Sequence, residues 1–106
     1  MKISTEIGSA SRLVGEEKAI EYIAKAGFDA WDFSMFQMCN YDWDTRKFVE
    51  SDHPLAKSNY LEFARRLKRI GEDNGIVCNQ SHAPFPSIYP ELTDYLKRAI
   101  ECTAEV

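Results

Sequence analysis

The sequence predicts an α/β fold with a parallel sheet, and three observations support this fold class. Short segments rich in apolar and β-branched residues alternate with segments of helical periodicity, in the order βαβαβα. Two of the helical segments end near a glycine, Gly27 and Gly75, which can adopt the positive φ that terminates a helix. Helices of this length return a chain to the start of a neighbouring parallel strand.

The first third of the chain predicts a strand, a loop, a helix and a second strand. Alternating apolar residues predict a strand over residues 2–7, and the small polar residues at 8–11 predict a loop. Apolar residues recur at helical intervals from Glu16 to Ala26, so this segment predicts a helix. The strand pattern resumes over residues 28–36. Its expected buried centre is Ala30, Trp31 and Phe33.

The middle of the chain is less regular. Residues 37–54 mix aromatic, acidic and proline residues without a sustained period, which predicts a long loop with a short helical turn near residues 45–49. Loops longer than about 12 to 15 residues in compact domains are often lids or binding segments. Apolar periodicity then predicts helices over residues 55–73 and 92–103, with a third strand over residues 76–80 between them.

Two parallel architectures fit this order of elements: an open doubly wound sheet and part of a (β/α)8 barrel. The first βα turn, GSASRLVG, lacks the G-x-G-x-x-G pattern of dinucleotide-binding sheets, which disfavours the open sheet. In both architectures the crossovers are right-handed, and ligands bind at the carboxyl ends of the strands.

Composition limits the class of protein and its partners. The 106 residues suffice for one domain, and 13 basic against 17 acidic side chains give a net charge of -4, which argues against a nucleic-acid partner. No segment reaches the roughly 20 apolar residues of a membrane span, and the first residues lack the apolar region of a secretory signal. We therefore expect a cytoplasmic protein without a membrane partner.

Two further sets of residues are expected to be structural. A local basic run is expected to be the solvated face of a helix. It consists of Arg65, Arg66, Lys68 and Arg69. The cysteines form no C-x-x-C pair and are expected to be reduced, partly buried thiols. They are Cys39, Cys78 and Cys102.

Polar side chains stand where each predicted strand passes into its loop. They are Glu6, Asp32, Ser34, Asn79, Gln80 and His82. Because the carboxyl ends of parallel strands meet at one edge of a sheet, we expect these side chains to share one rim.

His82 offers the most versatile chemistry of this group. It lies in the stretch SHAPFP, where Pro84 and Pro86 stiffen the backbone that follows. A neutral imidazole has one donor and one acceptor, so at a strand end it can bind a hydroxyl, transfer a proton or ligate a metal. The alternative is a histidine that only satisfies a loop carbonyl.

Two carboxylates accompany this histidine. Asp32 alternates with Trp31 and Phe33, which are expected to be buried, so its side chain faces the other way, where it can accept a hydrogen bond from a polyol. The alternative for Asp32 is a helix cap or a salt-bridge partner. Glu6 must reach the rim to remain solvated.

Other candidates are expected to lie outside the site. Asp42 and Asp44 look like a paired carboxylate site but are expected to be solvated turn acids, and His53 is expected to be a surface residue. The aromatic residues of this region are expected to divide between the core and a pocket wall on which a sugar ring can stack. They are Trp31, Phe33, Phe36, Tyr41 and Trp43.

Two phrases carry a resemblance to a known family. KAGFDAWDFSMF resembles the second-strand region of the xylose isomerase-like sugar phosphate isomerase/epimerase superfamily, and SHAPF is similar to that family's third-strand H-A-P-Y/F phrase. The resemblance covers nearly the whole chain, and the H-A-P-F phrase is its specific part. His82 matches the histidine of this phrase, and Asp32 matches the family's second-strand acid, with Asp in place of the more usual Glu.

The resemblance implies a (β/α)8 TIM barrel whose members isomerise, epimerise or dehydrate sugars and inositols, commonly with a divalent metal. A complete barrel needs about 250 residues, so these 106 residues would be its first three βα units. The family's metal ligands come from the second half of the barrel, so neither a metal ligand nor a catalytic residue is assigned in this chain.

We therefore expect the N-terminal part of a sugar isomerase or epimerase that is inactive alone and that pairs with the rest of the barrel or with itself. Its expected ligand is a sugar or sugar phosphate, bound through His82, Asp32, Glu6 and Gln80. One alternative is an endonuclease IV-like phosphodiester hydrolase, and the other is a small non-catalytic α/β domain that binds a ligand or a partner.

Overall fold

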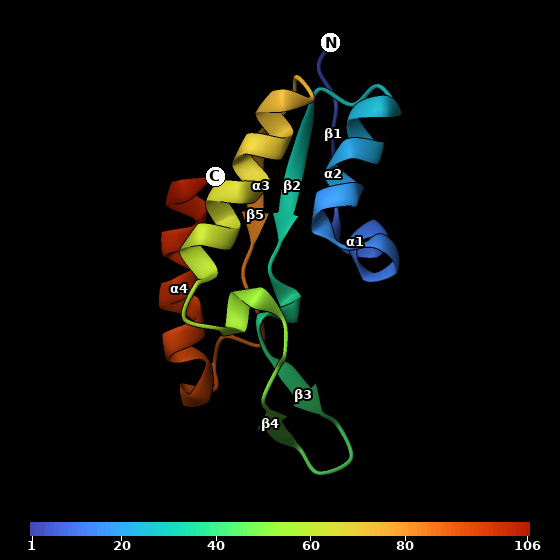
Figure 1. The fold of residues 1–106 in the computed structure, drawn as a ribbon. Coiled ribbons are helices and arrows are strands. Elements are labelled where there is room, and N and C mark those ends of the chain that lie inside the picture. Colours follow the sequence, from blue (N-terminus) through green and yellow to red (C-terminus); the bar gives the residue numbers. More distant parts are fainter.

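The computed structural model describes all residues from Met1 to Val106 and contains a three-stranded parallel sheet of order β1-β2-β5, with a small antiparallel hairpin (Figure 1). The parallel strands are β1 (Ser4–Glu6), β2 (Ala30–Ser34) and β5 (Val77–His82), and the hairpin consists of β3 (Asn40–Asp42) and β4 (Lys47–Val49). The helices are α1 (Gly8–Val14), α2 (Glu16–Lys25), α3 (Tyr60–Asp73) and α4 (Thr93–Glu105). Short 3-10 helices occupy Phe36–Met38, Pro54–Ala56 and Pro90–Leu92.

The parallel α/β class predicted from the sequence is confirmed, and the three strands do not close into a barrel. Helices α2, α3 and α4 cover one face of the sheet (Figure 1). Trp31 and Phe33 of β2 point to this face and are fully buried there with apolar side chains of the helices, such as Ile20, Phe63 and Leu67. The opposite face carries no helix.

Several predicted elements differ from the structure. The residues expected as a loop at 8–11 belong to α1, where the Ser11 hydroxyl donates to the Gly8 carbonyl at 3.0 Å and so satisfies a polar side chain inside the helix. The helix expected from residue 55 begins at Tyr60, because Pro54–Ala56 forms a 3-10 helix and Lys57 is extended. Strand β5 runs on to His82, beyond the predicted residue 80.

The helical turn expected at residues 45–49 is wrong, because this segment forms the second half of the β3–β4 hairpin. Asp42 starts the turn: its Oδ1 accepts the backbone N–H of Asp44 at 2.9 Å and of Thr45 at 3.3 Å. These backbone donors, Thr45 first, lower the pKa of Asp42. The predicted role of Asp42 as a turn acid is therefore confirmed.

The basic run on α3 forms ion pairs between helices. Arg65 contacts Glu105 of α4 through two bonds of 2.8 and 3.1 Å, and Arg66 contacts Glu17 of α2 at 2.6 Å. All of these groups are solvent-accessible, so each pair contributes little to the stability of the fold. None of the helices combines the length and the apolar composition that crossing a membrane requires.

The closest approach between α3 and the sheet occurs at Gly71. A Cβ at this position would lie 2.9 Å from Trp31 Nε1 and 3.1 Å from the carbonyl oxygen of Ile76. Alanine favours a helix over glycine by about 1 kcal/mol, but overpacking of this kind costs about 1 to 3 kcal/mol. Glycine is therefore required at position 71 because there is no space for a Cβ atom, and not because of its backbone angles.

We expect Gly71→Ala to lower the free energy of unfolding by about 1 to 2 kcal/mol in urea denaturation, because the clash outweighs the gain in helix propensity. The control is Glu72→Ala, an exposed neighbour on the same helix, which should change stability by less than about 0.5 kcal/mol. A Gly71→Ala protein more stable than the wild type would contradict the close packing of α3 on Trp31.

The burial of Cys102 on α4 predicts that the free energy of unfolding depends on pH. Its thiol is fully buried, and burial, with a smaller effect of Glu101 and Glu105, raises its pKa to about 11. An unfolded thiol titrates near 8.5, so the neutral thiol stabilises the fold fully below that pH, and this contribution is lost as the pH rises toward 11.

Between pH 8 and pH 10.5 the wild type should therefore lose about 2 kcal/mol of unfolding free energy more than Cys102→Ala does. Urea denaturation of both proteins at the two pH values measures this difference. Parallel losses in the two proteins would show that the Cys102 thiol ionises equally in the folded and the unfolded states, which would contradict its raised pKa.

Candidate functional site

The carboxyl-end site, as we call it, consists of five polar residues on the helix-free face of the sheet: Glu6, Asp32, Ser34, Gln80 and His82. In the strand register Glu6 and Gln80 flank Asp32, and His82 stands beside Ser34. Paired residues of adjacent strands point to the same face of a sheet. The structure therefore brings together the four residues predicted to bind a ligand.

Asp32 and His82 form the central contact of this site. Asp32 Oδ1 lies 2.9 Å from His82 Nδ1, the Asp32 side chain is 11% exposed, and the His82 side chain is 44% exposed. An ionised carboxylate only accepts hydrogen bonds, so Nδ1 carries the proton in this pair. The Nε2 atom of a neutral His82 is then an acceptor, able to receive a hydrogen bond or a proton from a ligand hydroxyl.

Glu6 is fixed by the start of α1. The backbone N–H of Gly8 donates to Glu6 Oε1, which places the carboxylate against the first turn of the helix. A Cβ on Gly8 would lie only 3.0 Å from Ser34 Oγ, so the absence of a side chain allows α1 to approach the site. Glu6 thus has one carboxylate oxygen bound to backbone.

Asn79 does not join the rim as expected. Its Oδ1 accepts from the Ser4 hydroxyl at 2.8 Å, and Ser4 pairs with Ala30 near the amino-terminal end of the sheet. The register shifts between Trp31 and Asp32, so Asn79 is an extra residue of β5 with no partner on β2. No periodicity in the sequence marks this irregularity.

The aromatic residues divide into three groups. Trp31 and Phe33 are in the core, as predicted, whereas Phe36 lies beside His82, with ring centroids 6.1 Å apart. Tyr41 and Trp43 belong to the hairpin, and their ring centroids are 4.7 Å apart. Only Phe36 therefore borders the carboxyl-end site directly.

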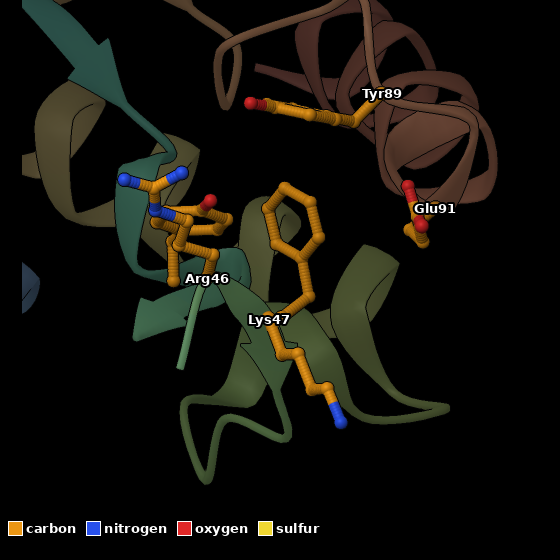
Figure 2. Close-up of a pocket in the computed structure, with 6 residues that line it drawn as sticks. Arg46, Lys47, Tyr89 and Glu91 are labelled. Atoms are coloured by element: carbon orange, nitrogen blue, oxygen red, sulfur yellow. The ribbon is translucent and has the colours of Figure 1, made fainter. Parts of the chain in front are cut away.

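A cavity of about 400 Å³ lies where the hairpin meets the loop before α4 (Figure 2). Figure 2 shows the ring of Tyr89 at one side of this cavity, while Lys47 extends away from it. Phe48 lies 5.0 Å from Tyr41 and 5.6 Å from Tyr89 between ring centroids, so the rings pack on one another and leave no room for a group between them. This cluster attaches the hairpin to the loop.

The residues of the carboxyl-end site do not fit a resident metal ion. No group of three or more His, Cys, Asp or Glu side chains lies close enough together to hold one. Asp32 and His82 bind each other, and Glu6 accepts from Gly8. Divalent metals in proteins take at least three or four ligands, which this arrangement does not supply.

Another acid and base pair, Glu16 and His53, was missed by the sequence analysis, and this pair is buried. His53, expected at the surface, has a side chain only 11% exposed, and its Nε2 lies 2.6 Å from Glu16 Oε1, whose side chain is 8% exposed. The two residues are 37 positions apart, so no spacing rule connects them. The one available signal is a carboxylate in the first turn of α2, where the helix dipole favours negative charge.

This pair belongs to a hydrogen-bond network that holds the long segment between β2 and α3 in place. His53 Nδ1 accepts the backbone N–H of Leu55 at 3.2 Å, so its Nε2–H donates to Glu16 and the ring is neutral. The Ser51 hydroxyl donates to the Gln37 carbonyl at 2.7 Å and accepts the backbone N–H of His53 at 3.2 Å. The network therefore joins α2 to both ends of the segment that contains the hairpin.

We expect His53→Ala and Glu16→Ala each to lower the free energy of unfolding by about 2 to 4 kcal/mol, because each leaves a buried polar partner unsatisfied. A double-mutant cycle by urea denaturation should give a coupling energy of at least about 1 kcal/mol. Asp52→Asn, at an exposed neighbour of His53, is the control and should cost less than about 1 kcal/mol. Additive losses in the cycle would refute a direct Glu16–His53 interaction.

Comparison of the chain with family models, with curated proteins and with solved structures gives no match. A function for this chain therefore rests on the placement and the chemistry of the side chains described above.

Proposed function

We propose that this chain is the N-terminal part of a sugar or sugar phosphate isomerase or epimerase of the (β/α)8 type, and that its carboxyl-end site binds a sugar or polyol. The observation that carries the proposal is the gathering of Glu6, Asp32 and His82 on one sheet face at the carboxyl ends of three parallel strands. In parallel α/β folds this is the end at which ligands bind.

The distribution of helices supports a barrel over a doubly wound sheet. In a doubly wound sheet helices cover both faces, whereas in a (β/α)8 barrel they lie outside and the inner face has none. Here α2, α3 and α4 all pack on one face (Figure 1). Strands β1 and β5 are edges with unpaired backbone groups, to which the rest of a barrel or a second copy of the chain would add strands.

The side chains of the site suit a ligand with several hydroxyl groups. His82 Nε2 and the free oxygens of Asp32 and Glu6 accept hydrogen bonds, and the Gln80 amide both donates and accepts. Asp32 fixes the tautomer and the orientation of His82, as a carboxylate does in many acid and base pairs. His82 is thereby a positioned acceptor for a hydroxyl proton.

The family resemblance also implies a divalent metal, but these residues do not form a site for one. No step through a metal is therefore derived, and we expect this chain to bind a sugar without converting it. A non-catalytic binding domain is the second candidate, and one observation favours it: Asp32 and Glu6 already have partners within the chain, as structural acids do.

The test is a titration of the isotope-labelled chain with xylitol and D-fructose, followed by amide chemical shifts. We expect shifts at Glu6, Asp32, Ser34, Gln80 and His82, because these residues line the helix-free face. His82→Gln should weaken binding about tenfold, the effect of losing one good hydrogen bond to the ligand.

Asn79→Ala provides the control, since it removes a polar group from the same strand outside the rim and should leave binding within about twofold. The sugar assignment fails if neither xylitol nor D-fructose changes the chemical shifts of these amides at high millimolar concentration. It also fails if the shifts occur only elsewhere on the chain.

A further inference from the structure

A second cavity, of about 410 Å³, lies beside the carboxyl-end site. Its lining includes Arg12 from α1, Phe36 from the turn after β2, Trp43 from the hairpin and Phe85 from the loop after β5. Phe36 is shared with the carboxyl-end site, because its ring neighbours both His82 at 6.1 Å and Phe85 at 5.4 Å between centroids. The cavity and the site therefore adjoin across one aromatic wall.

Arg12 is the cationic group of this cavity. It lies one helical turn after Gly8, the residue that binds Glu6, so the same short helix contributes to both places. Its side chain is exposed and forms no ion pair with an Asp or Glu, in contrast to Arg65 and Arg66. A guanidinium without a protein partner presents a planar set of donors that matches the oxygens of a phosphate or carboxylate.

The aromatic walls suit the carbon skeleton of a sugar. Trp43 is 78% exposed and Phe85 is 70% exposed, although both are large apolar side chains. A sugar ring has an apolar C–H face that can cover such rings and remove them from water. The volume is near the lower end of the range for small-molecule sites, which fits a monosaccharide and not a polymer.

We propose that this cavity binds the anionic end of the ligand, with the phosphate or carboxylate of a sugar acid or sugar phosphate held by Arg12. The inference rests on the proposed function, because the hydroxyl end of the same ligand would reach Asp32 and His82. The cavity in Figure 2 is a weaker candidate for this role, since Arg46 there shares the lining with the carboxylate of Glu91.

The test compares D-fructose, D-fructose 6-phosphate and D-gluconate on the full chain by amide chemical shift titration. We expect at least one of the two anions to bind about tenfold more tightly than fructose, as one charge-assisted contact provides. Arg12→Gln should abolish this difference while leaving the affinity for fructose within about twofold. Preference for the phosphate or for the carboxylate identifies the anionic group.

Arg69→Gln is the matched control, because it removes an exposed arginine from α3 without touching either cavity wall, and it should change none of the affinities. Equal binding of all three ligands, or an equal loss for all three in Arg12→Gln, overturns the anion subsite and leaves the sugar site standing. If no sugar binds, the proposed function fails. Inorganic phosphate then decides: shifts around Arg12 that Arg12→Gln removes support the anion subsite, and their absence overturns it.

Discussion

The two-residue periodicity of β2 is the constraint on which the rest of the structure depends. All five residues of this central strand are buried, yet they serve two different faces. Trp31 and Phe33 enter the helix-covered core, and Asp32 points to the opposite face with the other polar residues of the site. A slip of one residue would place a carboxylate among leucine and isoleucine side chains and an indole on the polar face, so the packing of the core also fixes the position of the site.

The low exposure of Asp32 has a chemical consequence. A carboxylate in this environment needs a hydrogen-bond donor, and His82 on the neighbouring strand supplies one. The interaction uses only one of the two nitrogens of His82 and leaves Nε2 without a hydrogen-bond partner in the chain. The same hydrogen bond therefore satisfies a buried acid and orients a base, which links the stability of β2 to the binding capacity of the site.

The elements that the sequence predicted are those set by local periodicity. The parallel order, the core residues Trp31 and Phe33, and the common face of Glu6 and Asp32 follow from strand alternation and from the geometry of crossover connections. The Glu16–His53 pair and the β3–β4 hairpin depend instead on contacts between distant residues and on a turn in which Arg46 takes a φ of 55°. Neither leaves a periodic pattern in the sequence. The small polar residues at 8–11 are typical of a loop, but in α1 the Ser11 hydroxyl bonds to the Gly8 carbonyl, so the sequence pattern does not reveal this helix.

The polar composition of the helix-free face distinguishes it from the interior of a (β/α)8 barrel that is filled by apolar side chains. Inner layers of many (β/α)8 barrels are packed with bulky branched side chains, whereas this face presents Ser4, Asn79 and Gln80 in addition to the acid and histidine pair. Polar groups that face the interior of a barrel need water or a ligand as partners, because burial without hydrogen bonds is costly. A face of this kind is stable in contact with water when the sheet is open. When the sheet is part of a larger assembly, the same groups favour an interior filled by water or by a polar ligand over one filled by apolar side chains.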